Sequence, residues 1–100
     1  MNVRVILPAQ LALLAKCDRE LEFELSSKPT ISDLLDAIEN RLPSLRGTIR
    51  DPVTQKRRPF VRYFACEADL SHYPAETELP DEVVNGSETF VILGAIAGGT

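Results

Sequence analysis

The chain ends in FVILGAIAGGT, from Phe90 to Thr100, and this stretch decides how the rest of the sequence is interpreted. Residues 90–93 are apolar and partly β-branched, which is typical of a buried strand. The residues after Gly94 are small and uncharged. A segment containing Gly98-Gly99 is narrow enough to enter a tunnel in another protein, because glycine has no Cβ atom. From the tail alone, a frayed chain end or a cloning remnant explains these residues as well as a functional tail does.

The composition predicts one globular domain. The chain has 100 residues, of which 44% are hydrophobic and 26% are charged, and this suffices for one core without a deep, enclosed active site. The net charge of -4 argues against general nucleic-acid binding. No apolar run is as long as a membrane span, and the N-terminus lacks the pattern of a signal peptide. We therefore expect a cytoplasmic protein without nucleic-acid or membrane partners.

Cysteine and histidine give little support for catalysis or metal binding. Cys17 and Cys66 form no CxxC pair, and His72 is the single histidine, so no zinc-binding set is expected. A triad would have to use His72, which lies in a polar stretch. The two cysteines could form a disulfide, but two ordinary thiols fit a reducing compartment better.

The first half of the sequence predicts two strands and one helix. Residues 2–7 alternate as a strand that Pro8 ends. Residues 9–16 have helical propensity, but the closeness of the next strand favours a loop or a single helical turn. Residues 19–25 alternate leucine or phenylalanine with glutamate, so one face of this strand is wet.

The clearest helix runs from Ile31 to Arg41. Thr30 is its N-cap, with an acidic residue three positions on, and Pro43 ends it. Apolar side chains recur at helical spacing along one stripe: Ile31, Leu34, Leu35, Ile38 and Leu42. A further turn after Pro43 would bring Leu45 and Ile49 inward.

The second half begins with a loop over residues 51–59 that contains Lys56-Arg57-Arg58. This basic group is either a partner-docking site or a solvated loop. In the strand over residues 60–65, Phe60, Arg62 and Phe64 point to one face. That face is either covered or shows an aromatic patch to a partner.

The rest of the second half is irregular until its end. A tight connection follows over residues 66–69, and residues 70–79 are irregular. Asn85-Gly86 marks a turn before the closing strand at residues 89–93.

This order of elements predicts an α+β fold with a mixed sheet of four to five strands and one main helix packed across it. The first and last strands should be parallel neighbours at its centre. The order and the end Gly94-Ala95-Ile96-Ala97-Gly98-Gly99 resemble the β-grasp, ubiquitin-like sulfur carriers of the MoaD/ThiS family. The similarity is closest to the longer members, which serve cysteine biosynthesis or are described only as MoaD-like. We thus expect a β-grasp domain over residues 1–94 and a flexible tail over residues 95–100.

The resemblance implies a carrier that is not itself an enzyme. An E1-like activating enzyme would use ATP and magnesium to adenylate the carboxylate of Gly99, and sulfur would then displace AMP to leave a thiocarboxylate for cofactor or cysteine biosynthesis. The carrier binds no cofactor itself. Its other partners would be a sulfur donor or acceptor enzyme. The tail residues Ala95, Ile96, Ala97 and Gly98 would enter the partner, and Phe60, Arg62 and Phe64 would form the docking surface.

Thr100 departs from this pattern, because it blocks the carboxylate of Gly99. A protease removes Thr100, or Thr100 is not native, or the chain is not a carrier. Gly94 stands where family members often have proline, and Cys66-Glu67-Ala68-Asp69 stands where they have a turn similar to Asn-Gly-Glu-Asp. The alternative function is a ubiquitin-like modifier or a non-covalent adaptor.

Overall fold

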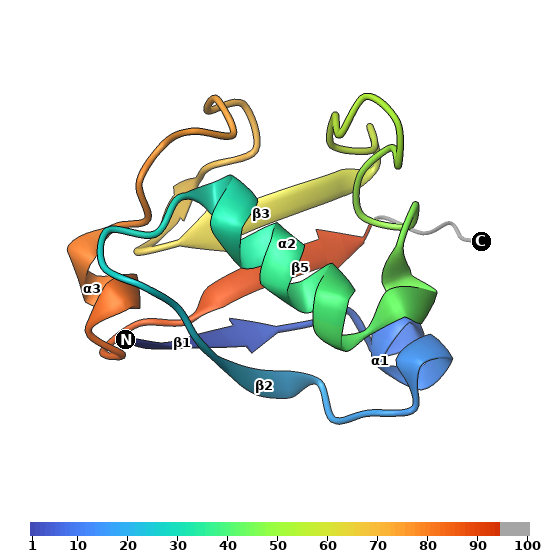
Figure 1. The fold of residues 1–100 in the computed structure, drawn as a ribbon, viewed down its shortest axis with the longest axis horizontal. Coiled ribbons are helices and arrows are strands. Elements are labelled where there is room, and N and C mark those ends of the chain that lie inside the picture. Colours follow the sequence, from blue (N-terminus) through green and yellow to red (C-terminus); the bar gives the residue numbers. More distant parts are fainter. Residues whose placement is uncertain (95–100) are drawn as a thin grey trace.

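Parallel pairing of the first and last strands organises the sheet. The computed structural model describes residues 1–94, and in it β1 (Asn2–Ile6) runs parallel to β5 (Phe90–Gly94). Antiparallel partners flank this pair, β2 (Glu20–Glu24) beside β1 and β3 (Val61–Ala65) beside β5. The short β4 (Ala68–Asp69) completes the order β2-β1-β5-β3-β4 (Figure 1). The predicted mixed sheet with a central parallel pair is confirmed.

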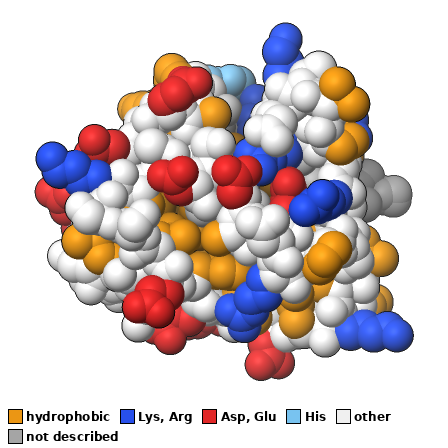
Figure 2. Space-filling view, viewed as in Figure 1, with side chains coloured by type: hydrophobic (Ala, Val, Ile, Leu, Met, Phe, Trp, Pro, Cys, Tyr) orange, Lys and Arg blue, Asp and Glu red, His pale blue; other side chains and the backbone are white. Residues whose placement is uncertain are grey.

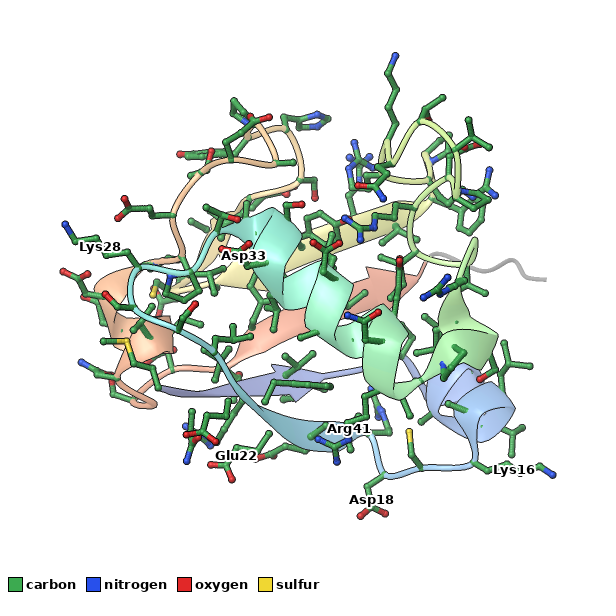
Figure 3. All side chains as sticks on the ribbon, viewed as in Figure 1. Lys16, Asp18, Glu22, Lys28, Asp33 and Arg41 are labelled. Atoms are coloured by element: carbon green, nitrogen blue, oxygen red, sulfur yellow. The ribbon has the colours of Figure 1, made fainter. Side chains whose placement is uncertain are left out.

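The helix α2 (Ile31–Arg41) crosses one face of this sheet, as Figure 1 shows. Its start is a capping box, in which Thr30 Oγ1 accepts from the Asp33 N–H at 3.1 Å and Asp33 Oδ2 accepts from the Thr30 N–H at 2.9 Å. At its other end Arg41 donates to the backbone oxygen of Glu22 at 2.8 Å (Figure 3). Helix and β2 are thereby tied together. Both predicted helix bounds are confirmed.

The core lies between α2 and the sheet. The inward side chains of α2 and of the strands are at most 4% exposed: Ile31, Leu34, Leu35, Ile38, Val3, Val5, Phe23, Val61, Tyr63, Ala65, Phe90 and Ile92. Tyr63 and Phe90 pack with ring centroids 5.6 Å apart. The short η1 (Pro43–Leu45) brings Leu45 and Ile49 into this core, as predicted. Each such large side chain stabilises the fold by about 1.5–3 kcal/mol.

The prediction of a loop or single turn for residues 9–16 is wrong, because α1 (Ala9–Ala15) is a helix. The Pro8 oxygen accepts from the N–H groups of Leu11 and Ala12 at 3.1 and 3.0 Å, and Lys16, in the left-handed region at φ 56°, ends the helix. Its buried face carries Ala12. The helix forms the connection between the antiparallel strands β1 and β2. At its two ends the Leu7 N–H donates to the Arg19 oxygen at 2.7 Å, which continues the pairing of these strands.

The segment between β4 and β5 is irregular, as predicted, except for the short helix α3 (Asp81–Val84), which the sequence analysis did not predict. Val83 of α3 is buried in the core. The predicted turn at Asn85-Gly86 is confirmed, since Gly86 has φ 86°. Figure 1 places α3 and α1 at opposite ends of the sheet. Among residues 1–94, no helix is long and apolar enough to span a membrane.

Candidate docking face and root of the tail

The described part of the chain stops at the root of the predicted reactive tail. Its last residue, Gly94, ends β5 and pairs with Val61 of β3. The predicted tail residues Ala95, Ile96, Ala97, Gly98 and Gly99 lie outside the described residues. The geometry of the site therefore concerns the sheet and the groove from which this tail begins.

The face of the sheet that faces away from α2 carries a half-exposed apolar patch, here called the sheet face. Arg62 and Phe64 of β3 are half-buried, while Val61, Tyr63 and Ala65 on the other face belong to the core. The ladders place Leu93 opposite Arg62, Val91 opposite Phe64, and Ile6 opposite Val91. The sheet face thus consists of Ile6, Arg62, Phe64, Val91 and Leu93, with Leu93 43% exposed.

Sequence reasoning found only part of this surface. It predicted Arg62 and Phe64, and it missed Ile6, Val91 and Leu93. The alternation in the first and last strands would have identified these three side chains as outward-facing. Their meeting with Phe64 depends on the central parallel pair, which places the first and last strands side by side.

Phe60 lies apart from the predicted row, because β3 begins one position later, at Val61. Its side chain is 47% exposed and lines a groove of about 390 Å³. The other lining residues are Pro8, Leu11, Gly47, Thr48, Arg58, Val61 and Gly94. Phe60 therefore stands at the root of the tail, since Gly94 lines the same groove.

Charge is unevenly placed along the sheet face. At one edge β2 exposes Glu20, Glu22 and Glu24, and Glu20 lies 3.5 Å from the Arg4 guanidinium. At the other side Arg62 Nη1 lies 3.3 Å from His72 Nε2. A partner that covers this face would meet carboxylates over β2, apolar side chains in the middle and Arg62 over β3.

Two cations of the predicted basic group are used inside the protein. Arg57 donates to the backbone oxygens of Ser71, Arg58 and Val61 at 2.9, 3.0 and 2.6 Å. Arg58 donates to the Gly47 oxygen at 2.9 Å and lies 3.7 Å from Asp51. The side chain of Lys56 has no such contact in the described part of the chain. The basic group thus holds its loop onto β3, which the sequence alternatives did not include.

Two observations concern metal binding and thiol chemistry in the described residues. No group of three His, Cys, Asp or Glu side chains within residues 1–94 is placed to hold a metal ion. Cys17 and Cys66 are free thiols. Burial and the carboxylates of Glu82 and Glu88 raise the pKa of the Cys66 thiol, which opposes its use as a nucleophile.

Comparisons with solved structures agree with this architecture. The chain is similar to SAMP1 from Haloferax volcanii, with TM-score 0.76 and 15% identity over 99% of this chain and 100% of that one. It is similar to the Amycolatopsis orientalis BexX/CysO complex, with TM-score 0.72 and 22% identity over 97% and 99%. It is also similar to the small archaeal modifier protein 1 of Methanosarcina acetivorans, with TM-score 0.70 and 25% identity over 98% of this chain and 96% of that one.

No protein-family model matches the sequence, and neither does any curated protein. The similarity to known proteins is therefore one of structure, over nearly the whole chain. The chain has the β-grasp fold of the ubiquitin-like carrier and modifier proteins, as the resemblance to the MoaD/ThiS family implied.

Proposed function

We propose that this protein is a sulfur carrier whose terminal glycine, Gly99, is activated by a partner enzyme after Thr100 has been removed. The observation that carries the proposal is the position of Gly94. This residue ends a central strand of a β-grasp sheet, and the sequence continues from it into Ala95-Ile96-Ala97-Gly98-Gly99. From Ala95 to Gly99 an extended chain spans roughly 15 Å, at about 3.3 Å per residue.

The chemistry needs no side chain of the carrier. Hydrolysis of the Gly99–Thr100 peptide bond frees a carboxylate, which attacks the α-phosphate of ATP and releases pyrophosphate. A sulfide-level sulfur donor then attacks the acyl carbon of the adenylate. The bond from this carbon to the phosphate oxygen breaks, and AMP leaves with that oxygen. The partner supplies magnesium and phosphate binding. In this division of labour the carrier contributes the terminal carboxylate and the surface that the partner binds.

The sheet face and Phe60 give the partner a place to bind. Exposed aromatic and aliphatic side chains beside an arginine are favoured in interfaces, and Leu93 and Phe60 are 43% and 47% exposed. Both lie close in sequence or space to Gly94, so a partner that covers them also receives the tail. In the BexX/CysO complex, a structural neighbour of this chain does bind a second protein.

A ubiquitin-like modifier is the second candidate, and it is favoured by the neighbours described as small archaeal modifier protein 1. It would use the same adenylate of Gly99, but a lysine amine of another protein would receive the glycyl group. A non-covalent adaptor would use the sheet face alone. The three functions differ in what becomes of the tail.

The test compares three chain lengths with an E1-like activating enzyme from the same cells. We expect ATP-dependent AMP formation with the chain that ends at Gly99, and none with the full chain or with the chain that ends at Gly98. Intact mass spectrometry of protein from native cells should show loss of Thr100 and replacement of one oxygen by sulfur. Larger conjugates without sulfur would support the modifier. An intact Thr100 under all conditions would contradict both covalent functions and leave the adaptor.

A further inference from the structure

A polar cavity lies on the opposite side of the sheet from the sheet face. Its volume is about 810 Å³, within the range of small-molecule sites. It is bounded by the N-terminal part of α2, by the loop before β3 and by the segment after β4. In Figure 1 the loop (green) and the segment (orange) rise above α2. In Figure 2, Lys and Arg side chains lie beside acidic ones on this side of the molecule.

The Tyr63 hydroxyl opens into this cavity. Tyr63 is 4% exposed and lines the cavity, yet its oxygen makes no hydrogen bond to any described residue. Within residues 1–94, every fully enclosed side-chain nitrogen or oxygen has a partner. The unbonded Tyr63 oxygen therefore keeps some accessible surface, and Tyr63 lines this cavity. A hydroxyl held in this position is therefore available to a ligand.

Two guanidinium groups share the cavity wall with this hydroxyl. Arg50 is 2% exposed, and its Nε and Nη2 are bonded to Glu39 and Asp36, which leaves Nη1 without a hydrogen bond to a described atom. Arg57 uses Nε and Nη1 on backbone oxygens, which leaves Nη2. No carboxylate within the described part of the chain lies within salt-bridge distance of Arg57, so its charge is uncompensated.

The wall is held rigidly. Arg57 reaches the Ser71 and Val61 oxygens and so ties the two bordering segments to β3, while Ser71 Oγ accepts from the Tyr63 N–H at 2.9 Å. Such locked side chains present donors in fixed directions. The first N–H groups of α2 take no part, because those of Ile31 and Ser32 already donate to the Thr77 and Ala75 oxygens, each at 2.9 Å.

From this arrangement we infer that the cavity binds the phosphate or carboxylate group of a small molecule, through Tyr63, Arg50 and Arg57. A planar or tetrahedral oxyanion can accept from the hydroxyl and from both free guanidinium nitrogens. Lys56 stands at the same cavity and adds attraction, while Asp33 and Glu76 limit the site to one anionic group. The site is independent of the tail chemistry, because Tyr63 and Arg62 point to opposite faces of β3.

The test is a titration of the full chain with inorganic phosphate and, separately, with acetate, followed by ¹⁵N–¹H spectra against sodium chloride of equal ionic strength. We expect saturable shifts of the amides of Tyr63, Arg57 and Ser71. Phosphate binding alone identifies phosphate compounds as the ligand class, and acetate binding alone identifies carboxylates. Shifts that are absent, or that rise linearly and spread over all basic surface residues, would overturn the proposal.

Two variants and one control locate the site. Tyr63→Phe keeps the ring packed on Phe90 and removes only the hydroxyl, so the dissociation constant should rise about five- to tenfold. Lys56→Met should raise it about two- to threefold, and Lys16→Met, just after α1, should leave it unchanged. Thermal unfolding checks that both proteins are folded. Equal affinities of Tyr63→Phe and the wild type for the anion would then contradict the assignment.

Discussion

Arg50 Nε donates to Glu39 Oε2 over 3.0 Å, and this contact joins the segment after η1 to the last turn of α2. It is nearly closed to solvent, since the side chains of Arg50 and Glu39 are 2% and 13% exposed. Glu39 Oε1 also accepts from Nη2 at 3.2 Å. Removing one partner of such a buried ion pair destabilises the fold by more than the intact pair stabilises it, because the other charge is left buried without compensation.

Replacing Glu39 by glutamine should therefore lower the free energy of unfolding by about 2–3 kcal/mol. The remaining carboxylate, that of Asp36, is 53% exposed and compensates only partly. Urea unfolding of the variant and the wild type measures the difference. Asp36→Asn is the matched control and should cost less than about 1 kcal/mol, because its group is exposed. An equal loss in the free energy of unfolding for the two variants would show that the Arg50–Glu39 pair is as solvated as the contact with Asp36.

A second prediction concerns the turn between β3 and β4. Cys66 and Glu67 have φ 53° and 62°, and they connect Ala65 and Ala68, which pair directly. This is the geometry that favours Asn-Gly, because residues with a Cβ are strained in it. Glu67→Gly should raise the free energy of unfolding by about 0.5–1 kcal/mol, measured by urea unfolding. The same change at Glu76, which lies outside the left-handed region, should lower stability.

Local signals were enough to predict some of these elements from the sequence. Thr30, the apolar stripe of α2 and Pro43 act within one helix, so its bounds were correct. The tight connection predicted over residues 66–69 is correct for Cys66 and Glu67 but wrong for Ala68–Asp69, which form β4. The left-handed backbone of the turn was not predicted, because neither residue type indicates it. The helix α1 was missed because the helical propensity of residues 9–16 was set against the short distance to the next strand, which favoured a loop. The packing of Ala12 against the core decides for the helix.

The surfaces were harder to predict, since they are made by residues far apart in the sequence. The sheet face joins Ile6 to Val91 through the parallel ladder. Arg57 looked like a docking residue because no sequence pattern shows that the Ser71 oxygen lies within its reach. The cavity beside Tyr63 depends on three separate segments of the chain. Such long-range placements follow only from the three-dimensional fold.

The capping box leads to a third prediction. Thr30 Oγ1 and Asp33 Oδ2 each accept from the other residue's N–H, at 3.1 and 2.9 Å. Thr30→Ala leaves the Asp33 N–H without its acceptor and should cost about 1 kcal/mol in the free energy of unfolding. Ser32→Ala is the matched control, since Ser32 caps nothing and alanine favours the helix. A loss as large for Ser32→Ala would locate the effect elsewhere in α2.

Acid sensitivity should depend in part on Asp51. Its carboxylate accepts from the N–H groups of Thr54 and Val53 at 2.9 and 2.8 Å, and these bonds, with Arg58, lower its pKa. Because the pKa is lower in the folded state, the stabilisation is complete above the unfolded-state pKa of about 3.9 and is lost as the pH falls through the folded value.

Asp51→Asn should therefore be less stable than the wild type near neutral pH, and this difference should vanish in strong acid. Urea unfolding at a series of pH values measures the gap, and Glu76→Gln, at an exposed carboxylate without a hydrogen bond to a described residue, is the control. A gap that stays constant with pH would mean that the asparagine only disturbs the turn, and that the charge of Asp51 contributes nothing.

The sheet face supplies the last prediction, which rests on the proposed activation of Gly99. In the chain that ends at Gly99, Arg62→Glu should raise the KM of AMP formation about tenfold with little change in kcat. Arg62 lies in the middle of the docking surface, opposite Leu93, whereas the reacting carboxylate is untouched. Leu93→Ser should have a similar effect, because the exposed leucine is an apolar contact.

Lys28→Glu is the control for charge, since Lys28 is exposed just before α2, at the left edge of Figure 3, and does not belong to the sheet face. It should leave the KM unchanged. If the KM rises equally for Arg62→Glu and Lys28→Glu, the partner senses only the net charge of the carrier. If kcat falls while the KM is constant, the sheet face acts on the position of the tail after binding, because a loss confined to the transition state lowers kcat alone.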